Sequence, residues 1–211
     1  MSQSQNDPAH VKNMTRKSIQ ISSFIMWPMM IGFGVVAVPF VQLVLTEKWL
    51  PCVPFLRIFC FTYGLWPIHT ANLQAINAMG RSDLFLKLEI IKKSVGLVAL
   101  FASMPISPLA MAWSLIIADI IATFVNAYPN IKILNYSYKE QFKDVCTPLF
   151  FSVLMGVSIY PIQFLRINDY LILFLQIVLG FVSYIVISLI FKHEILYYIL
   201  DILKKSRKKG K

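Results

Sequence analysis

Six polar or aromatic residues recur at helical spacing along a mostly apolar stretch that begins near residue 53. At 100° per residue they share one face of a helix, which starts with two aromatic rings and ends with a cation. The members of this polar stripe are Tyr63, Trp66, Thr70, Gln74, Asn77 and Arg81. Amides and hydroxyls can bind the hydroxyl groups of a sugar, and aromatic rings suit its apolar faces. The stripe is therefore a candidate wall of a sugar-binding cavity, with packing against neighbouring helices as the alternative.

A single acid, Asp119, lies near the centre of a later apolar stretch, residues 109–128. A charged, unpaired carboxylate in the middle of a membrane costs about 3 kcal/mol or more, so it should be neutral, paired or facing a cavity. Thr123 and Asn126 share its helix face and are candidate partners. They favour a structural acid over a proton- or ion-coupling carboxylate.

Enzyme motifs are absent from the sequence. It has no HExxH, no phosphate-binding glycine loop, no nucleophile elbow and no paired carboxylates at helical spacing. The three cysteines have no metal-ligand spacing. His69, alone in an apolar stretch, favours an interhelical hydrogen bond over catalysis. We therefore expect no catalytic residue, no metal and no cofactor.

Composition places the chain in a membrane. Hydrophobic residues make up 57% of the 211 and charged residues only 14%, more apolar surface than a water-soluble chain of this length could bury. The net charge of +10 could suggest a nucleic-acid partner. However, the cations gather in short segments between apolar stretches and in the tail, which argues against nucleic acid and for a lipid surface.

The apolar stretches predict an all-α membrane protein, a polytopic bundle of six transmembrane helices with short amphipathic cytoplasmic elbows. The expected spans cover residues 19–45, 53–79, 88–104 (or 94–104), 109–128, 145–165 and 170–191. The polar segment 130–144 is expected to be one of the elbows.

Residue types within the spans predict their shape. Two prolines and two glycines should bend or locally unwind the first span: Pro28, Gly32, Gly34 and Pro39. Ser152 and Gly156 should allow a close helix contact in the fifth. The sixth is apolar all round, which is typical of a helix facing lipid.

Three regions follow from this pattern. Residues 1–18 form a cytoplasmic amphipathic elbow, with a short helix from Pro8 to Lys17 on the membrane surface. Residues 19–192 form the six-span bundle. Residues 193–211 form a basic cytoplasmic tail whose amphipathic helix should lie on an anionic leaflet.

The distribution of cations predicts the orientation. Six spans place 17 of the 20 Lys and Arg residues on one side, and Lys48, Arg57 and Arg166 on the other. By the positive-inside rule, both termini are expected in the cytoplasm.

Several pieces of the sequence carry a family resemblance. EKWLPCVPFLRIFC, NLQAINAMGRSD and LFLKLEIIKK follow one another, with QNDPAHVKNMTRKSI and FIMWPMMIGFGVVAVPFV upstream. In order and spacing they resemble the lipopolysaccharide and exopolysaccharide flippases (Wzx-type) of the multidrug, oligosaccharidyl-lipid and polysaccharide exporter superfamily. The likeness covers about residues 3–100, and the remainder only by its pattern of spans.

The resemblance implies a carrier, not an enzyme, in the bacterial inner (plasma) membrane. Its substrate would be a polyprenyl-diphosphate-linked oligosaccharide for O-antigen, exopolysaccharide or capsule biosynthesis. Two lobes of about six helices would move it by alternating access, and this chain resembles the carboxyl-terminal half. The implied partners are membrane lipids, the lipid-linked oligosaccharide and an amino-terminal lobe or partner chain.

Two alternatives stay open. The chain could be a non-transporting membrane module or remnant associated with a glycan-assembly complex. It could also be a drug/cation antiporter of the same superfamily, which Asp119, the only acid near the centre of a span, supports weakly.

Overall fold

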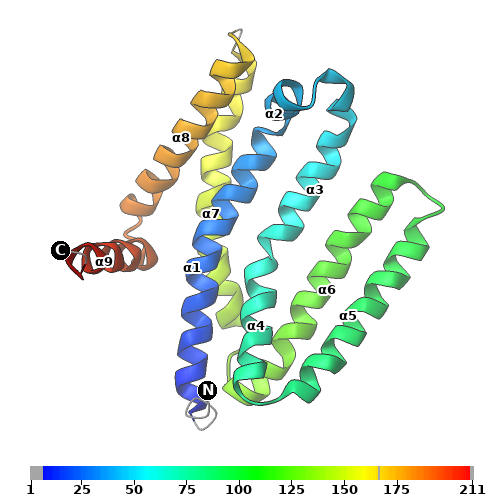
Figure 1. Ribbon diagram of the computed structural model, residues 1–211, viewed down its shortest axis with the longest axis vertical. Coiled ribbons are helices and arrows are strands. Elements are labelled where there is room, and N and C mark those ends of the chain that lie inside the picture. The colour runs from blue at the N-terminus through cyan, green and yellow to red at the C-terminus, as the bar shows by residue number, and fades with distance from the viewer. Residues whose placement is uncertain (1–6, 166, 210–211) are drawn as a thin grey trace.

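The computed structural model describes residues 7–165 and 167–209, and every regular element in these ranges is a helix (Figure 1). The elements are α1 (Pro8–Val35), α2 (Ala37–Val44), the 3₁₀ helix η2 (Glu47–Cys52), α3 (Val53–Gly64), α4 (Trp66–Ala78), α5 (Ser82–Ser103), α6 (Pro108–Leu134), α7 (Tyr138–Ile159), the 3₁₀ helix η3 (Tyr160–Phe164), α8 (Asp169–Ile190) and α9 (Glu194–Lys209). The predicted all-α class is confirmed. Two cations counted in the predicted orientation, Arg166 and Lys211, lie outside the described residues.

Five helical segments among the described residues are long and apolar enough to cross a membrane. They are Pro8–Val35, Glu47–Ala78, Pro108–Leu134, Tyr138–Phe164 and Asp169–Ile190. The predicted third span is α5, which lies beside α6 as a hairpin but carries four charged residues between positions 87 and 93: Lys87, Glu89, Lys92 and Lys93 (Figure 1). The prediction of six spans is therefore not confirmed.

The first helix is longer than the sequence suggested. The Asp7 side chain accepts a hydrogen bond of 3.0 Å from the His10 backbone N–H, and Pro8 occupies the first turn. From there α1 continues without a break to Val35. The predicted short helix from Pro8 to Lys17 is thus not separate, because these residues form the first turns of α1.

Prolines interrupt the first two spans. The first span breaks at Val36, as predicted, where Pro39 in the first turn of α2 has no N–H to donate to the Val35 carbonyl. The stretch from residue 53, predicted as one helix, breaks at Leu65 between α3 and α4. Pro67 causes this second break in the same way.

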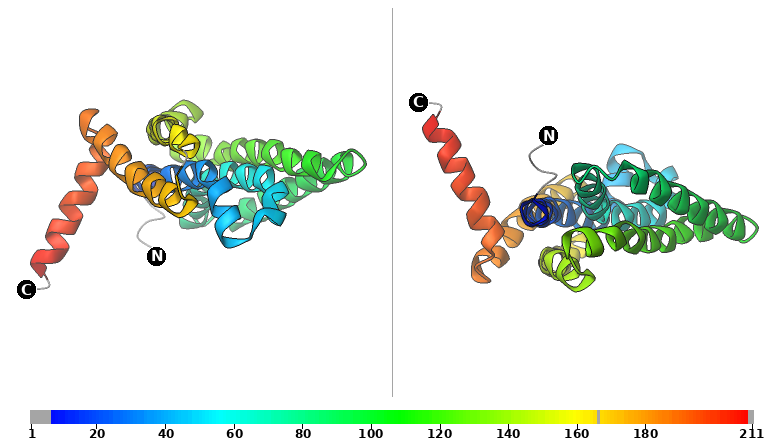
Figure 2. Two further views of the ribbon diagram at one scale, coloured as in Figure 1. Left: turned by 90° about the horizontal axis from the view of Figure 1, so that it is seen from above. Right: turned by 90° about the horizontal axis from the view of Figure 1, so that it is seen from below.

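Helix α1 lies in the middle of a flattened bundle and packs against α7, α3 and α4 (Figure 2). Ser152 is fully buried, and a Cβ atom on Gly156 would lie 2.9 Å from Cγ2 of Ile31. The predicted close contact of α7 is therefore confirmed. On the other side, a Cβ on Gly64 would lie 2.5 Å from Cζ3 of Trp27, so α3 approaches α1 closely only because residue 64 lacks a side chain.

The segment 130–144 is not an elbow. Helix α6 continues through Pro129 to Leu134, and the chain turns at Asn135, whose φ is 52°. Helix α7 then begins at Tyr138 with a capping box between Ser137 and Glu140. The polar residues of this segment lie on the adjoining ends of two long helices, where several bind other helices.

The sixth predicted span, α8, is not apolar all round. One face is buried against the bundle and repeats every four residues: Ile172, Gln176, Gly180, Tyr184 and Ser188. The Tyr184 hydroxyl donates a hydrogen bond of 2.8 Å to the Phe24 carbonyl of α1. The remaining faces carry exposed apolar side chains, as a helix facing lipid requires.

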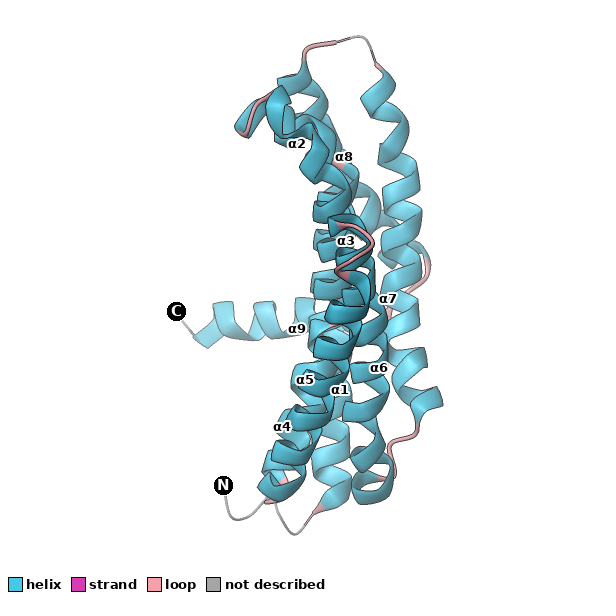
Figure 3. Cartoon of the chain, turned by 90° about the vertical axis from the view of Figure 1, so that its right-hand side faces the viewer, coloured by secondary structure: helices cyan, strands magenta, loops and turns pink. Residues whose placement is uncertain are grey.

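The last helix, α9, lies across the direction of the spans (Figures 1 and 3). At its start, the His193 ring stacks on Phe24 with centroids 5.3 Å apart. Ile195 and Leu196 are buried in the same cluster, against Phe24, Phe151 and Tyr184. This cluster fixes the position of α9 on the bundle.

Candidate functional site

Helix α4 has two polar faces, and one of them points into the bundle. Asn72 is fully buried, and its Nδ2 donates to Oε1 of Gln141 at 2.9 Å. Its Oδ1 accepts from Nδ2 of Asn130 at 2.7 Å. These bonds join α4 to α6 and α7, so this face has a packing role.

His69 joins α4 to α6 above this contact. Its Nε2 lies 3.3 Å from Oγ1 of Thr123, and its Nδ1 lies 2.9 Å from Nδ2 of Asn126. Because the Thr123 hydroxyl donates to the Asp119 carbonyl at 2.9 Å, Nε2–H donates to Thr123, and Nδ1 accepts from Asn126. The predicted interhelical hydrogen bond of His69 is confirmed, and these bonds fit a neutral imidazole.

The other face of α4 carries the predicted stripe. Gln74 and Asn77 are exposed, and the partly exposed Thr70 donates its hydroxyl to the Trp66 carbonyl at 3.1 Å. Tyr63 and Trp66 are 53% and 59% exposed, with ring centroids 6.2 Å apart. Within the described bundle, the side-chain hydrogen bonds from α4 to other helices come from His69 and Asn72. Its apolar contacts come from the buried Ile68, Ala71 and Ala75, and the stripe faces outward.

Two stripe residues are not on α4: Tyr63 lies at the end of α3, and Arg81 follows α4. The helix ends at Ala78, and Arg81 precedes the first residue of α5. Its Nε and Nη2 lie 3.0 and 3.2 Å from the two carboxylate oxygens of Asp83. Hydrogen bonding to Asp83 raises the pKa of Arg81, so the guanidinium stays charged and is already paired at the surface.

Asp119 lies half-buried on α6, as its position in the stretch predicted. Its predicted partners are wrong: Thr123 binds the Asp119 backbone carbonyl, and Asn126 binds His69. Among the described residues, the structure shows no hydrogen bond to the carboxylate. The ammonium of Lys92 on α5 acts on it electrostatically and also forms an ion pair with Glu89.

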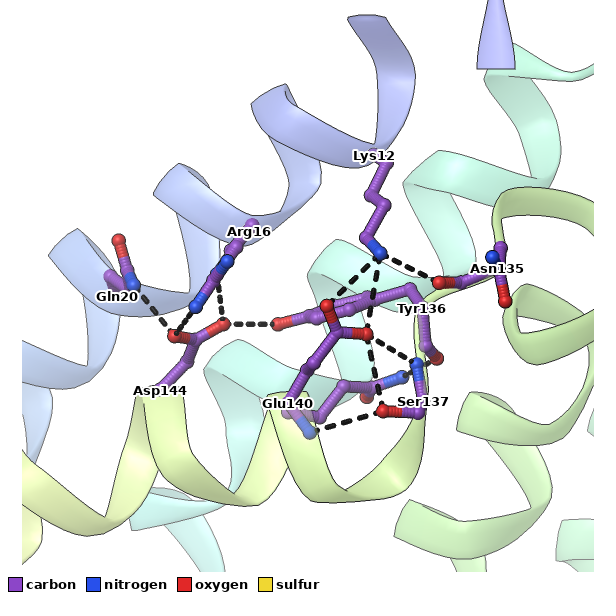
Figure 4. Close-up of polar contacts among 9 residues, drawn as sticks. Lys12, Arg16, Gln20, Asn135, Tyr136, Ser137, Glu140 and Asp144 are labelled. Carbon is purple, nitrogen blue, oxygen red and sulfur yellow. Dashed lines mark hydrogen bonds and ion pairs between the residues drawn. The ribbon is translucent and has the colours of Figure 1, made fainter. Parts of the chain in front are cut away.

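Sequence reasoning missed an ion-pair cluster that joins α1 to α7 (Figure 4). Lys12 Nζ lies 3.0 Å from a Glu140 carboxylate oxygen and 2.6 Å from the Asn135 carbonyl. One turn further on, Arg16 binds both carboxylate oxygens of Asp144, at 2.8 and 3.0 Å. Asp144 is 2% exposed, so its charge depends on these partners.

Two further donors complete the cluster. Nε2 of Gln20 and the hydroxyl of Tyr136 donate to Asp144 at 2.6 and 2.8 Å. Burial, with the Asp144 charge next, raises the pKa of Tyr136, so the phenol remains a proton donor. The sequence does contain a signal for this cluster. Lys12 and Arg16 are four residues apart, and so are Glu140 and Asp144, so each pair lies on one face of its helix and the two pairs can match.

Comparisons with known proteins show a similarity to proteins of polysaccharide biosynthesis. A family model described as "Polysaccharide biosynthesis protein" matches residues 1–54. The teichuronic acid biosynthesis protein TuaB of Bacillus subtilis (strain 168) is 25% identical over 152 residues, which cover 72% of this chain and 31% of TuaB. The chain therefore spans about a third of the length of this curated relative.

A solved structure shares the fold. The lipid II flippase MurJ, in an inward closed conformation, matches with a TM-score of 0.76 at 18% identity. The match covers 91% of this chain and 41% of MurJ. With the family model and the relative, it confirms the resemblance predicted from the sequence. The chain is a multi-pass membrane protein that is similar to a polysaccharide biosynthesis family over residues 1–54 and to TuaB over 152 residues, and it shares its fold with the lipid II flippase MurJ.

Proposed function

We propose that this chain forms one lobe of a flippase that carries a polyprenyl-diphosphate-linked oligosaccharide across the membrane. The observation that carries the proposal is the outward polar face of α4. Gln74 and Asn77 bind none of the described neighbouring helices, and Tyr63 and Trp66 are exposed beside them. Amides facing acyl chains would lack hydrogen-bond partners, so this face requires water, a sugar or another protein surface.

A second lobe would supply that covering surface. The chain spans 41% of MurJ, which leaves room for another lobe in a protein of that size. In the proposed carrier this chain is the carboxyl-terminal lobe, and the stripe is one wall of a cavity between the lobes. Alternating access would open the cavity first to the cytoplasm and then to the opposite side.

The charge of the substrate supports the need for a partner. A diphosphate entering a membrane cavity needs cations or several hydrogen-bond donors, because an unpaired buried charge is costly. The only cation of the stripe, Arg81, is bound to Asp83 at the surface. The amino-terminal lobe would therefore supply the cations that bind the diphosphate in the cavity between the lobes.

The proposed setting is the inner membrane of a bacterium, with both termini in the cytoplasm. Residues 1–18 and 193–211 would be the cytoplasmic ends, and residues 19–192 the membrane lobe. The glycan would belong to an O-antigen, an exopolysaccharide or a capsule.

Complementation tests this proposal. In a flippase-deficient strain, the 211-residue chain alone should not restore surface polysaccharide. Co-expression with the amino-terminal lobe of a related polysaccharide flippase should restore it, and replacing both Gln74 and Asn77 by leucine should abolish that rescue. Rescue by the chain alone would contradict the one-lobe proposal. Full rescue by the double leucine variant would contradict the role of the stripe.

A further inference from the structure

An apolar groove runs between α3 and α6, away from the polar stripe. Its volume is about 650 Å³, within the range of small-molecule sites. Its lining comes from two helix faces: Pro54, Arg57, Ile58 and Phe61 on α3, and Leu109, Trp113, Ile116 and Ile120 on α6. Seven of these eight side chains are uncharged, and Arg57 is the exception.

The groove extends along both helices. Both helices run from the end of the bundle that carries η2 toward the end that carries the α4–α5 turn (Figure 1). Leu109 and Ile120 mark the two ends of the lining on α6, about 16 Å apart at 1.5 Å per residue. Hydrocarbon chains of a bilayer lie in this same direction, so the groove can accept one along its length.

Arg57 lines the groove and lies in the second turn of α3. Its Nε donates a hydrogen bond of 3.0 Å to the Gly34 carbonyl at the end of α1. This bond holds the guanidinium in place. Among the described residues, its terminal nitrogens have no hydrogen-bond or ion-pair partner. Two donors on a fixed cation match the geometry of a phosphate.

We propose that this groove binds the polyprenyl diphosphate part of the lipid-linked substrate, with the hydrocarbon against Ile58 and Ile116 and a phosphate on Arg57. This inference rests on the proposed function and extends it to a second site for the same substrate. An amphiphile with an anionic group and a branched hydrocarbon fits both the single cation and the apolar lining. A neutral apolar helix would leave the Arg57 charge unpaired.

The position of Arg57 along the groove indicates in which leaflet the phosphate would lie. Arg57 lies nearer the η2 end of the groove than Phe61 and Ile120 do. In the proposed topology that end is periplasmic. The groove would therefore hold the lipid in the outer leaflet, where the substrate leaves the carrier after flipping.

Direct binding to the purified 211-residue chain tests the site. Native mass spectrometry in detergent would use three probes: farnesyl diphosphate, inorganic pyrophosphate and phosphatidylglycerol. Farnesyl diphosphate should bind at least tenfold more tightly than either of the others. Equal binding of pyrophosphate would show an anion site without the groove, and equal binding of phosphatidylglycerol would show a general lipid site. Either result would overturn the assignment.

Three variants distinguish a loss of binding in the groove from a loss of folding. Arg57→Gln should weaken farnesyl diphosphate binding about tenfold, while Arg57→Lys, which keeps the charge but lacks the paired donors, should show a smaller loss. Ile116→Trp should fill the groove and weaken binding with Arg57 intact, and this variant does not depend on the Gly34 contact. Unchanged binding in both Arg57→Gln and Ile116→Trp would place the probe elsewhere. Binding needs no transport, so its failure is distinguishable from failed complementation.

Discussion

Arg16 and Asp144 form a bidentate ion pair between the parallel helices α1 and α7, with N–O distances of 2.8 and 3.0 Å. Asp144 also accepts hydrogen bonds from Gln20 and Tyr136. One nearly buried carboxylate therefore binds three donor residues, two on α1 and one in the turn before α7. Such a carboxylate holds the packing of α1 on α7 in one register.

Replacing Asp144 by alanine should therefore destabilise the protein. Breaking a buried pair costs about 3–5 kcal/mol, but Arg16 is 38% exposed, so we expect about 2 kcal/mol. The matched control is Lys12→Ala, whose partner Glu140 is 35% exposed and whose loss should cost about 1 kcal/mol or less. Denaturant unfolding in detergent measures both. Equal effects of the two variants would contradict the organising role of Asp144.

Gly64→Ala should disturb the contact of α3 with α1. The new methyl group would lie 2.5 Å from Cζ3 of Trp27, so the ring or the helix must move, at about 2 kcal/mol. Gly96 on α5 is the control, because a Cβ there meets no atom within 4 Å. We expect Gly64→Ala to lower the thermal midpoint and Gly96→Ala to leave it unchanged or raised. A harmless Gly64→Ala would mean that the two helices are less closely packed.

Cysteine labelling distinguishes the two faces of α4. In a background without Cys52, Cys60 and Cys146, single cysteines at 74 and 77 should react with a water-soluble thiol reagent in a working two-lobe carrier. A cysteine at 76 should not react, because Ile76 is fully buried. The same low reactivity at all three positions would mean that the outward face is buried by packing and lines no aqueous cavity.

Asp119 can be tested by isosteric exchange. We expect Asp119→Asn to retain more transport than Asp119→Leu, because an amide keeps the polarity of a half-buried site whereas an isobutyl group does not. The measurement is polysaccharide export at matched membrane levels of the two variants. If the asparagine variant is inactive, Asp119 must ionise during transport, and an ion-coupled mechanism such as that of an antiporter gains support.

The contact of α9 with the bundle should weaken in acid. Burial lowers the pKa of His193, which outweighs the opposing effect of Glu194, so the folded state favours the neutral ring. The stabilisation is complete above the unfolded pKa of about 6.5 and is lost as the pH falls through the lower, folded value. Limited proteolysis at the α8–α9 junction should therefore accelerate below pH 6.5, and His193→Phe should remove this dependence.

The pattern of apolar stretches and prolines predicted the fold class and the break at Val36, because both depend on local composition. Pairing between distant helices was less predictable. Asp144 was assigned to an elbow, because the segment 130–144 is polar. In the structure α6 continues through Pro129, and Asn130 is buried against Asn72.

The candidate site shows the same limit. Gln74 and Asn77 share one exposed face because they lie on one unbroken helix, but periodicity did not identify Asn72 as a buried packing residue. Arg81 was misplaced because periodicity assumes that the helix continues, and α4 ends at Ala78. The four-residue repeat of polar side chains on α8, such as Gln176 and Tyr184, is visible in the sequence. It was hidden by the strongly apolar residues between them.

The contact of α9 with Phe24 indicates how deep α1 lies in the membrane. With α9 in the plane of the inner membrane surface, as its amphipathic sequence predicts, Phe24 marks that surface on α1. From Phe24 to Val35 the unbroken helix rises about 16 Å, roughly half of a hydrocarbon core about 30 Å thick. The break at Val36 would therefore lie near the middle of the bilayer.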